Sequence, residues 1–193
     1  MAAASPRPAL EGIRFYHKPD YSWLSNFYDE APFTLRGVRW DTVEHYFQAA
    51  KFFNTDAAYA EVVRGAGTPA EAKRAGRSRA HPLDPAWEEV KEGVMAEALA
   101  AKFAAGSDLA ARLVATAPHA LIEDAPRDYY WGAGARGTGK NRLGVLLVAV
   151  RTALIRGTAA GGGGGSGGSG SGGSGSSSGS AADDGEDPCP VAA

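Results

Sequence analysis

The sequence predicts an α+β fold, a mainly helical single domain with a few short strands. One observation is size, since residues 13–157 are long enough to bury a core but too short for two ordinary domains. A second is a run of helix-start signals, in which Ser, Thr or Asp precedes an apolar pattern of helical period. The third is that the few strand patterns are short.

The two ends of the chain have a different composition. Residues 161–180 contain only glycine and serine, twelve of the first and eight of the second, and four acidic residues follow between 183 and 187. Such segments bury too little apolar surface to offset the entropy lost on ordering. We therefore predict a flexible N-terminus over 1–12 and a disordered tail over 158–193. The only cysteine, Cys189, lies in this tail, so no intramolecular disulfide is expected.

Strand patterns occur in three places. Residues 13–17 alternate well enough for a short strand, and residues 33–40 read as two strands around a turn at Arg36-Gly37. The aromatic-rich residues 21–28 have no clean period, which indicates an ordered loop. Residues 120–123 are a further candidate strand.

The helices follow from their starts and stops. Asp41 is a candidate cap for a helix through 53, and Thr55 for one through about 65. Thr68-Pro-Ala-Glu71 forms a capping box with proline at the first helical position. The remaining predicted helices run from Asp84-Pro85 to Gly106, from Ser107 to about 115, and from 142 to 155 with a stop at Gly157; the first has Trp87, Val90, Val94, Ala98 and Ala101 at helical spacing.

Charge and hydropathy exclude several classes of function. Residues 13–157 contain 19 Lys and Arg against 17 Asp and Glu, which is too balanced for a broad duplex-binding surface, although a local basic patch remains open. No segment has the apolar length of a signal peptide or a membrane span. The scattered histidines show no metal-ligand spacing, so no metal or cofactor is expected. We predict a soluble cytoplasmic protein.

The helix predicted from Asp41 carries the strongest chemical signal. Glu44, Gln48 and Lys51 lie at i, i+4 and i+7, which places them on one face. A carboxylate beside an amine suits acid/base or imine chemistry. The alternative is structural and slightly favoured by the residues alone: Asp41-x-x-Glu44 is also a capping box, in which Glu44 bonds the N–H of Asp41 and the other two are solvated.

A glycine-rich run resembles two phosphate-binding motifs. Residues 132–137 match GxGxxG, and residues 134–140 match a Walker A motif except that Asn141 replaces the hydroxyl that binds Mg²⁺. Both motifs require further strands after the next helix, and here the predicted tail follows instead. Two readings stay open: successive backbone N–H groups cradle an anion with help from Arg136 and Lys140, or the glycines merely allow a tight turn.

The segment before this loop joins an acid to aromatic residues. Asp128 could bond ribose hydroxyls, and Trp131 could stack on a base or sugar. With equal weight, Asp128 caps a turn and Trp131 belongs to the core.

At this point the chain resembles the NADAR (YbiA-like) domain family. The resemblance covers nearly all of residues 13–157 in family order. It rests on Leu24-Ser-Asn-Phe-Tyr28, Thr42-Val-Glu-His-Tyr-Phe-Gln48, Lys51-Phe52, Gly76-Arg77, Trp87 with Val90-Lys91 and Val94-Met95, Lys102-Phe103, Asp128-x-x-Trp131-Gly132-x-Gly134, Gly139-x-Asn141-x-Leu-Gly144 and Arg151.

The resemblance implies a fold, an activity and a set of site residues. It implies an N-glycosidase that cleaves a phosphorylated ribose or ADP-ribose from nitrogen, with ribosylaminopyrimidine phosphates or ADP-ribosylated guanine as substrates, the latter extending to ADP-ribosylated nucleic acid. Imine formation on Lys51 and direct hydrolysis both remain open, as does a non-catalytic ADP-ribose-binding module. The implied catalytic residues are Glu44, Lys51 and Asp128, and the substrate contacts are Asn26, Gln48, Arg77, Trp87, Trp131, Gly134, Gly139 and Asn141.

Overall fold

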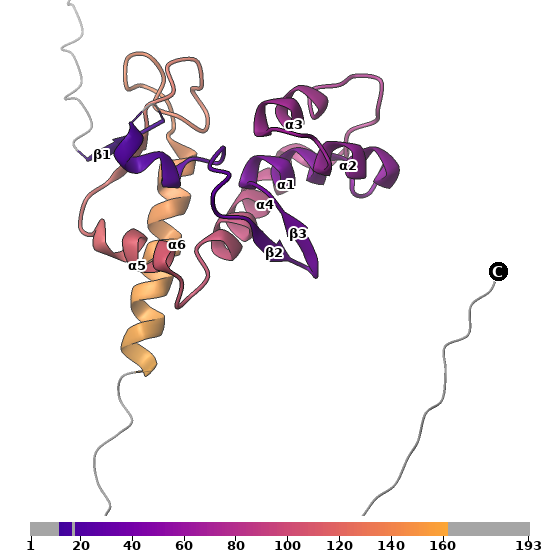
Figure 1. Ribbon diagram of the computed structural model, residues 1–193. Coiled ribbons are helices and arrows are strands. Elements are labelled where there is room, and N and C mark those ends of the chain that lie inside the picture. Colours follow the sequence, from indigo (N-terminus) through magenta and orange to yellow (C-terminus); the bar gives the residue numbers. More distant parts are fainter. Residues whose placement is uncertain (1–11, 17, 162–193) are drawn as a thin grey trace, which may run out of the picture. The chain divides into compact units, whose positions relative to one another are not determined.

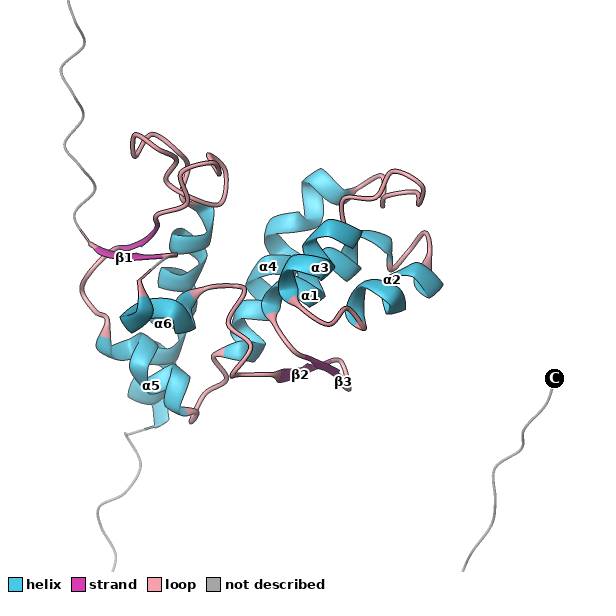
Figure 2. Ribbon diagram, turned by 45° about the horizontal axis from the view of Figure 1, so that its top comes forward, coloured by secondary structure: helices cyan, strands magenta, loops and turns pink. Residues whose placement is uncertain are grey.

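The computed structural model describes residues 12–16 and 18–161. The predicted tail beyond 161, with Cys189, and nearly all of the predicted flexible N-terminus lie outside the described residues. The predicted α+β class is confirmed, because short strands accompany a larger set of helices (Figures 1 and 2).

The strands form two separate pairs. β1 (Ile13–Phe15) lies parallel to β4 (Leu121–Glu123). β2 (Phe33–Leu35) and β3 (Val38–Trp40) form an antiparallel hairpin, as predicted, and both turn residues adopt left-handed backbone conformations, with φ of 53° at Arg36 and 76° at Gly37. The first part of the predicted loop over 21–28 instead belongs to a 3-10 helix, Pro19–Leu24.

The helices agree with the predicted order but not with every boundary. Thr68 caps its helix through the N–H of Glu71, and Ser107 caps its own through the N–H of Ala110, both as predicted. The helices are α1 (Val43–Ala49), which continues as a 3-10 turn (Ala50–Phe52), α2 (Ala57–Arg64), α3 (Pro69–Ala75), α4 (Trp87–Lys102), α5 (Asp108–Ala115) and α6 (Arg142–Gly161).

Several predicted boundaries are wrong, among them those of α4, which runs from Trp87 to Lys102 and not from Asp84-Pro85 to Gly106. Thr42, not Asp41, caps α1, and Asp56, not Thr55, caps α2; in each case a neighbouring residue with the same capping ability takes the position. α6 continues through Gly157, where a Cβ would meet nothing within 4 Å. Glycine weakens a helix by only about 1 kcal/mol and does not by itself end one.

α4 connects two groups of helices. α1, α2 and α3 pack together and contact α4 through α1, whereas α5 and β4 pack on α6, which contacts α4 from its other side (Figure 1). Residues far apart in the sequence therefore meet along α4, which places the end of α1 near the segment that leads into α6.

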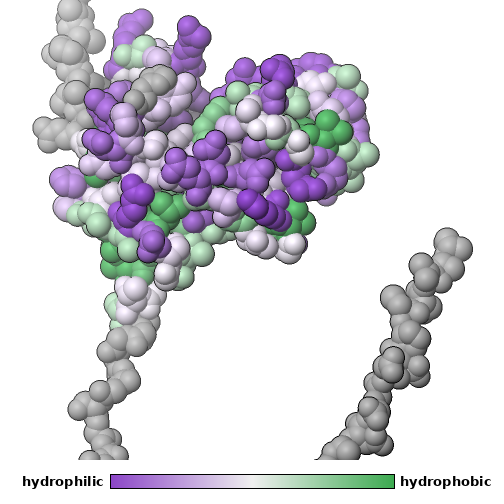
Figure 3. All heavy atoms as spheres, in the orientation of Figure 1, coloured by the Kyte–Doolittle hydropathy of each residue, from purple (hydrophilic) through white to green (hydrophobic). Residues whose placement is uncertain are grey.

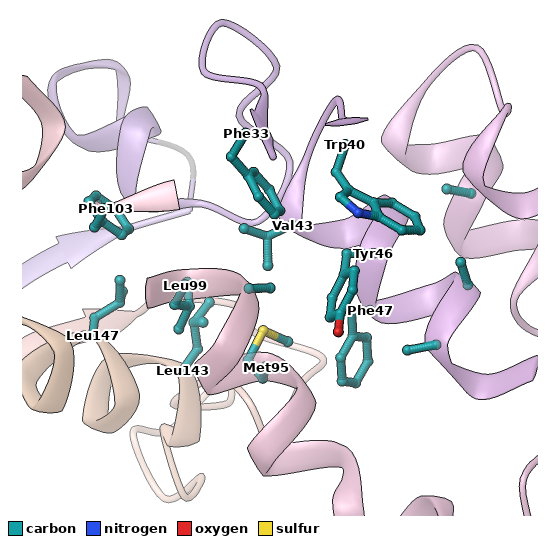
Figure 4. Packing of buried hydrophobic residues seen from close by; sticks show 14 of the residues in the cluster. Phe33, Trp40, Val43, Tyr46, Phe47, Met95, Leu99, Phe103, Leu143 and Leu147 are labelled. Atoms are coloured by element: carbon teal, nitrogen blue, oxygen red, sulfur yellow. The ribbon is translucent and has the colours of Figure 1, made fainter. Parts of the chain in front are cut away.

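The core follows this arrangement. Aromatic residues of the hairpin and α1 pack toward Met95 and Leu99 of α4 (Figure 4). The buried face of α4 contains Trp87, Met95 and Leu99, whereas Val90 of the predicted stripe is 41% exposed. Burying such large side chains contributes roughly 1.5–3 kcal/mol each. The face seen in Figure 3 is largely hydrophilic with smaller hydrophobic patches.

Candidate active site

The start of α1 settles the role of Glu44 in capping. The Thr42 hydroxyl accepts a hydrogen bond from the N–H of His45, and the N–H of Glu44 donates to the Asn26 carbonyl at 3.1 Å. Asp41 is exposed and lies 3.6 Å from Arg39. The Glu44 carboxylate instead accepts a hydrogen bond from Gln48 Nε2 at 2.8 Å, so the capping-box interpretation is wrong.

Glu44, Gln48 and Lys51 share one face, as their spacing predicts, and Gln48 joins the other two. Lys51 Nζ donates to Gln48 Oε1 at 2.6 Å and to the carbonyl of Gly76 at 3.1 Å. Glu44 and Gln48 are only 5% and 4% exposed, so neither belongs to a solvated face. The ammonium also lies 5.7 Å from the centre of the Trp87 ring.

Burial changes the ionisation of both end groups. It raises the pKa of Glu44, although the cations around it oppose the shift. Desolvation lowers the pKa of Lys51 to about 8, which Glu44 opposes while Arg77, Arg79 and Lys73 add to the lowering. A lysine in this environment is partly neutral near neutral pH and can act as a nucleophile.

These side chains line a cavity of about 310 Å³. The ring of Phe47 packs edge-on against Trp87 and Trp131, at centroid distances of 5.0 and 5.3 Å, and forms an aromatic wall. Eight of the predicted site residues lie around this cavity: Asn26, Glu44, Gln48, Lys51, Arg77, Trp87, Asp128 and Trp131.

The cavity also contains residues that the sequence predictions did not include. Lys73 and Lys91 add positive charge to its rim, and Glu88, Met95 and Tyr130 complete the lining. Lys91 and Met95 follow Trp87 at helical intervals, so the spacing along α4 carried a signal for them. Lys73 comes from α3, and its position could not be inferred without the packing of α3 on α1.

Asn26 presents an unsatisfied polar atom. Its Oδ1 is buried without a hydrogen-bond partner among the described residues, while its Nδ2 lies 3.4 Å from Met95 Sδ. A buried amide oxygen without a donor is unfavourable. A bound molecule with a hydroxyl or N–H group would satisfy it, which agrees with the predicted role of Asn26 in substrate binding.

Asp128 was predicted either to contact substrate or to cap a turn, and its position is compatible with both roles. Its Oδ1 accepts hydrogen bonds from the N–H groups of Tyr130, Trp131 and Gly132, at 2.9, 2.7 and 3.4 Å. The carboxylate therefore caps the turn that brings Trp131 to the cavity, and it lines the cavity itself.

The end of the glycine loop pairs with the segment that precedes it. The N–H groups of residues 139–143 donate to the carbonyls of residues 129–133, each to a different one, at 2.7–3.1 Å. The start of α6 therefore has its first N–H groups satisfied by the chain itself. These five N–H groups are therefore not free to bind an anion, which favours the tight-turn interpretation over the anion cradle with Arg136 and Lys140.

The predicted substrate contacts in this loop lie outside the cavity. Gly134 has a φ of +66°, and a Cβ there would lie 2.5 Å from the Tyr129 ring. At Gly139 a Cβ would lie 2.3 Å from the Gly132 carbonyl oxygen. Asn141 donates from Nδ2 to the Leu121 carbonyl at 2.8 Å and accepts at Oδ1 from the N–H of Glu123 at 2.9 Å, so its amide bridges β4 and is committed to the fold.

Glu123 is a buried acid that the sequence predictions did not single out. Its Oε2 is buried without a hydrogen-bond partner among the described residues. Burial raises the pKa of Glu123 to about 8, and the charges of Asp128 and Glu44 add to this effect. Glu123 is therefore a further proton-binding group near the cavity. The sequence contained no sign of it, because a single glutamate at the end of a strand forms no pattern.

The other groups considered in the sequence have structural roles or no grouping. His45 Nε2 lies 3.0 Å from the Ala66 carbonyl and Nδ1 2.8 Å from the Thr42 hydroxyl, which is the pattern of a buried structural histidine. Among the described residues, no three His, Cys, Asp or Glu side chains cluster as metal ligands do. None of the described helices has the length and hydropathy needed to span a bilayer.

Comparison with known proteins identifies the family of the chain. Residues 14–155 match the NADAR domain family. The chain is 48% identical over 143 residues to the N-glycosidase YbiA of Escherichia coli, which covers 74% of this chain and 88% of that protein. It is 39% identical over 132 residues to an N-glycosidase of Nostoc punctiforme, covering 68% and 84% of the two chains.

Two further matches extend this comparison. The chain is 38% identical over 124 residues to the chloroplastic riboflavin biosynthesis protein PYRR of Zea mays, which covers 60% of this chain and 20% of that protein. The solution structure of E. coli YbiA superposes with a TM-score of 0.70 at 47% identity, covering 76% of this chain and 86% of that one. The chain therefore belongs to the NADAR domain family.

Proposed function

We propose that the protein is an N-glycosidase that hydrolyses the bond between a phosphorylated ribose and a nitrogen base or amine. The observation that carries this proposal is the lysine, amide and carboxyl row of α1, which lies in an aromatic-walled cavity with cations at its rim. The names of the E. coli and N. punctiforme relatives support the same reaction class, and the name of the maize relative supports a substrate related to riboflavin biosynthesis.

The ionisation of the two end groups supports an imine route. In a glycosylamine, the nitrogen lone pair can expel the ring oxygen from C1, and the protonated Glu44 carboxyl gives that oxygen its proton. The neutral Lys51 amine then adds to C1, and the original nitrogen leaves after taking a proton. Water hydrolyses the Lys51–C1 imine, which releases the free sugar and restores the amine.

The rim supports a phosphorylated sugar. Lys73 and Arg77 line the cavity, and neither forms an ion pair with any described residue. Charge-assisted hydrogen bonds from such groups to a phosphate are stronger than those between neutral partners. Within this class we propose two substrates, a ribosylaminopyrimidine phosphate and an ADP-ribosyl group on guanine, including guanine in nucleic acid.

The test is incubation of the whole chain with a ribosylaminopyrimidine phosphate and, separately, with guanine-ADP-ribosylated DNA, with product masses as the readout. Release of the amine or of unmodified guanine together with the free sugar phosphate is the expected result. Borohydride in the reaction should add a sugar-sized mass to wild type and none to Lys51→Ala.

Other outcomes point elsewhere. Ligand-dependent thermal stabilisation without any product would indicate a non-catalytic ADP-ribose-binding module. Turnover that survives in Lys51→Ala and depends on Glu44 would replace the imine route by direct hydrolysis, in which a carboxylate activates water and Lys51 steadies the phosphate or a hydroxyl.

A further inference from the structure

Both polar ends of the Gln48 amide are already used. Its Nε2 donates to Glu44 and its Oε1 accepts from Lys51, and the side chain is only 4% exposed. An amide has a donor and an acceptor at fixed positions, so it can bond a carboxyl on one side and an ammonium or amine on the other. The sequence prediction that Gln48 contacts substrate leaves this arrangement without an explanation.

The amide stands where a direct ion pair would otherwise form. Lys51 Nζ is held by two neutral acceptors, Gln48 Oε1 and the Gly76 carbonyl, and it has no carboxylate among the ion pairs of the described residues. A buried carboxylate in direct contact with the ammonium would favour the charged form of both groups. A charged lysine cannot attack C1, and a charged glutamate cannot donate a proton.

Gly76 supplies a second, independent observation. Its backbone is ordinary right-handed helical, with φ of −64° and ψ of −4°, so the conformation does not require glycine. A Cβ at this position, however, would lie 2.1 Å from Gln48 Oε1 and 2.8 Å from Gln48 Cβ. The Gln48 side chain therefore occupies the space that a side chain at position 76 would fill.

We propose that Gln48 is a positioning residue that packs against Gly76. Its amide hydrogen-bonds both the Glu44 carboxyl and the Lys51 amine and prevents these two groups from contacting each other. The inference rests on the proposed function for its catalytic meaning, because separation matters only if both groups react. It assigns Gln48 a role through its neighbours and none in direct contact with substrate.

The first measurement is the titration of the Lys51 amine in the absence of substrate. The ¹³C-dimethyl signal after reductive methylation reports it, and loss of the signal in Lys51→Ala identifies it. The charged groups around Lys51 are left unchanged. Glu44 of α1, Lys73 of α3 and Arg77 and Arg79 after α3 shift its pKa. Glu88 and Lys91 of α4 and Asp128 line the same cavity.

Two substitutions at Gln48 distinguish a loss of separation between Glu44 and Lys51 from the loss of the amide alone. In Gln48→Ala the carboxylate can approach the amine, and the pKa of Lys51 should rise from about 8 by about one unit or more. In Gln48→Met a side chain of similar size still blocks that approach, so the pKa should not rise. A rise in both variants, or in neither, would overturn the proposal.

A double-mutant cycle with Gly76 tests the seat of the amide. Gly76→Ala should displace Gln48 and raise the pKa of Lys51 much as Gln48→Ala does. In the Gln48→Ala background the new methyl group has room, so Gly76→Ala should change the pKa little further. Equal and additive effects in the two backgrounds would show that Gly76 does not act through Gln48.

Kinetics distinguish positioning from substrate binding. Gln48→Ala should lower kcat/KM at pH 7 about tenfold to a hundredfold, in line with the smaller neutral fraction of Lys51. Affinity for 1,4-anhydroribitol 5-phosphate, which has no reactive C1, should change less than about threefold. A weaker affinity with an unchanged pKa would make Gln48 a substrate contact. If the wild type shows no turnover, the proposed function fails, but the titrations of Lys51 still show whether Gln48 keeps the Glu44 carboxyl away from the amine.

Discussion

The two walls of the cavity use their polar residues in opposite ways. On the α1 side, buried Glu44 and Gln48 and half-buried Lys51 line the cavity, and burial raises the pKa of Glu44 and lowers that of Lys51. On the opposite side, the Asp128 carboxylate accepts backbone N–H groups of its own turn, and the N–H groups of residues 139–143 donate to carbonyls of the preceding segment. The first wall contains the candidate reactive groups, and the second holds the Trp131 side chain at the cavity.

This difference changes how the glycine motif is read. The GxGxxG and Walker-like letters suggest a phosphate site, but here the glycines admit close backbone contacts, such as a carbonyl oxygen 2.3 Å from where a Cβ of Gly139 would lie. The same letters can thus arise because a loop packs on itself. Only the direction of the N–H groups separates these two causes, and that direction is a property of the folded loop.

Substitution of the buried carboxyl should produce the largest effect and the sharpest contrast between the walls. Glu44→Gln should lower kcat about a thousandfold, because the amide cannot transfer a proton. The same change should raise the free energy of unfolding at pH 7 by about 0.5–2 kcal/mol, since burial raises the pKa of Glu44 and penalises its charged form. Turnover and urea denaturation measure the two effects.

The matched control for this variant is Asp41→Asn. Asp41 is exposed and no longer a candidate cap, so neither activity nor stability should change appreciably. A Glu44→Gln protein that is less stable than wild type would mean that the carboxyl is structural, and the α1 wall would then resemble the opposite one.

On the glycine-loop side, stability should respond and chemistry should not. Gly139→Ala places a methyl group against the Gly132 carbonyl, which should lower the free energy of unfolding by about 1–3 kcal/mol. Gly157→Ala in α6 meets open space and should instead raise it by about 0.5–1 kcal/mol. Chemical denaturation of the two variants checks the contrast, and a loss of substrate affinity in folded Gly139→Ala would restore a binding role for the loop.

The same contrast shows what the sequence could predict. The row of Glu44, Gln48 and Lys51 was predictable because helical spacing is local, and so were the caps Thr68 and Ser107. Thr42 in place of Asp41 was not, since adjacent residues of equal capping ability compete and tertiary packing decides. Lys73 was missed because it reaches the cavity from another helix.

The backbone hydrogen bonds of the glycine loop could not be predicted from the sequence either, because they also depend on tertiary packing. Consecutive N–H groups from 139 to 143 meet the carbonyls of 133, 129, 132, 130 and 131 in that order, which follows no periodic rule. A periodic element can be inferred from residue spacing, whereas an irregular loop is defined by its own closed set of contacts.

The pH dependence of Lys51 should sharpen the contrast further. Because burial lowers its pKa to about 8, the rate of its modification by fluorodinitrobenzene should rise about tenfold from pH 7 to 9 and then level off. An ordinary lysine would rise about a hundredfold over this range without a plateau. Peptide mapping by mass spectrometry gives the rate at Lys51, and the absence of a plateau would remove the basis for the imine route.

The same shift predicts a stability difference with a definite sign. The unfolded chain holds the lysine proton up to its ordinary pKa of 10.5, and the folded chain releases it near 8. The contribution of Lys51 is therefore unfavourable below pH 8 and fades as the pH rises to 10.5. Lys51→Met should be more stable than wild type at pH 7, and the advantage should shrink toward pH 10.5 in denaturation curves.

The smallest expected effect concerns two arginines from the sequence analysis, Arg77 as an implied substrate contact and Arg136 as a helper at the glycine loop. Arg77 lines the cavity, whereas Arg136 is exposed on the glycine loop and does not. Arg77→Ala should weaken binding of 1,4-anhydroribitol 5-phosphate about tenfold, the usual scale for a hydrogen bond to a charged group. Arg136→Ala should change it less than about twofold in the same calorimetric titration. Equal losses at both positions would mean that the glycine loop reaches the ligand after all, and the division between a reactive wall and a supporting wall would have to be abandoned.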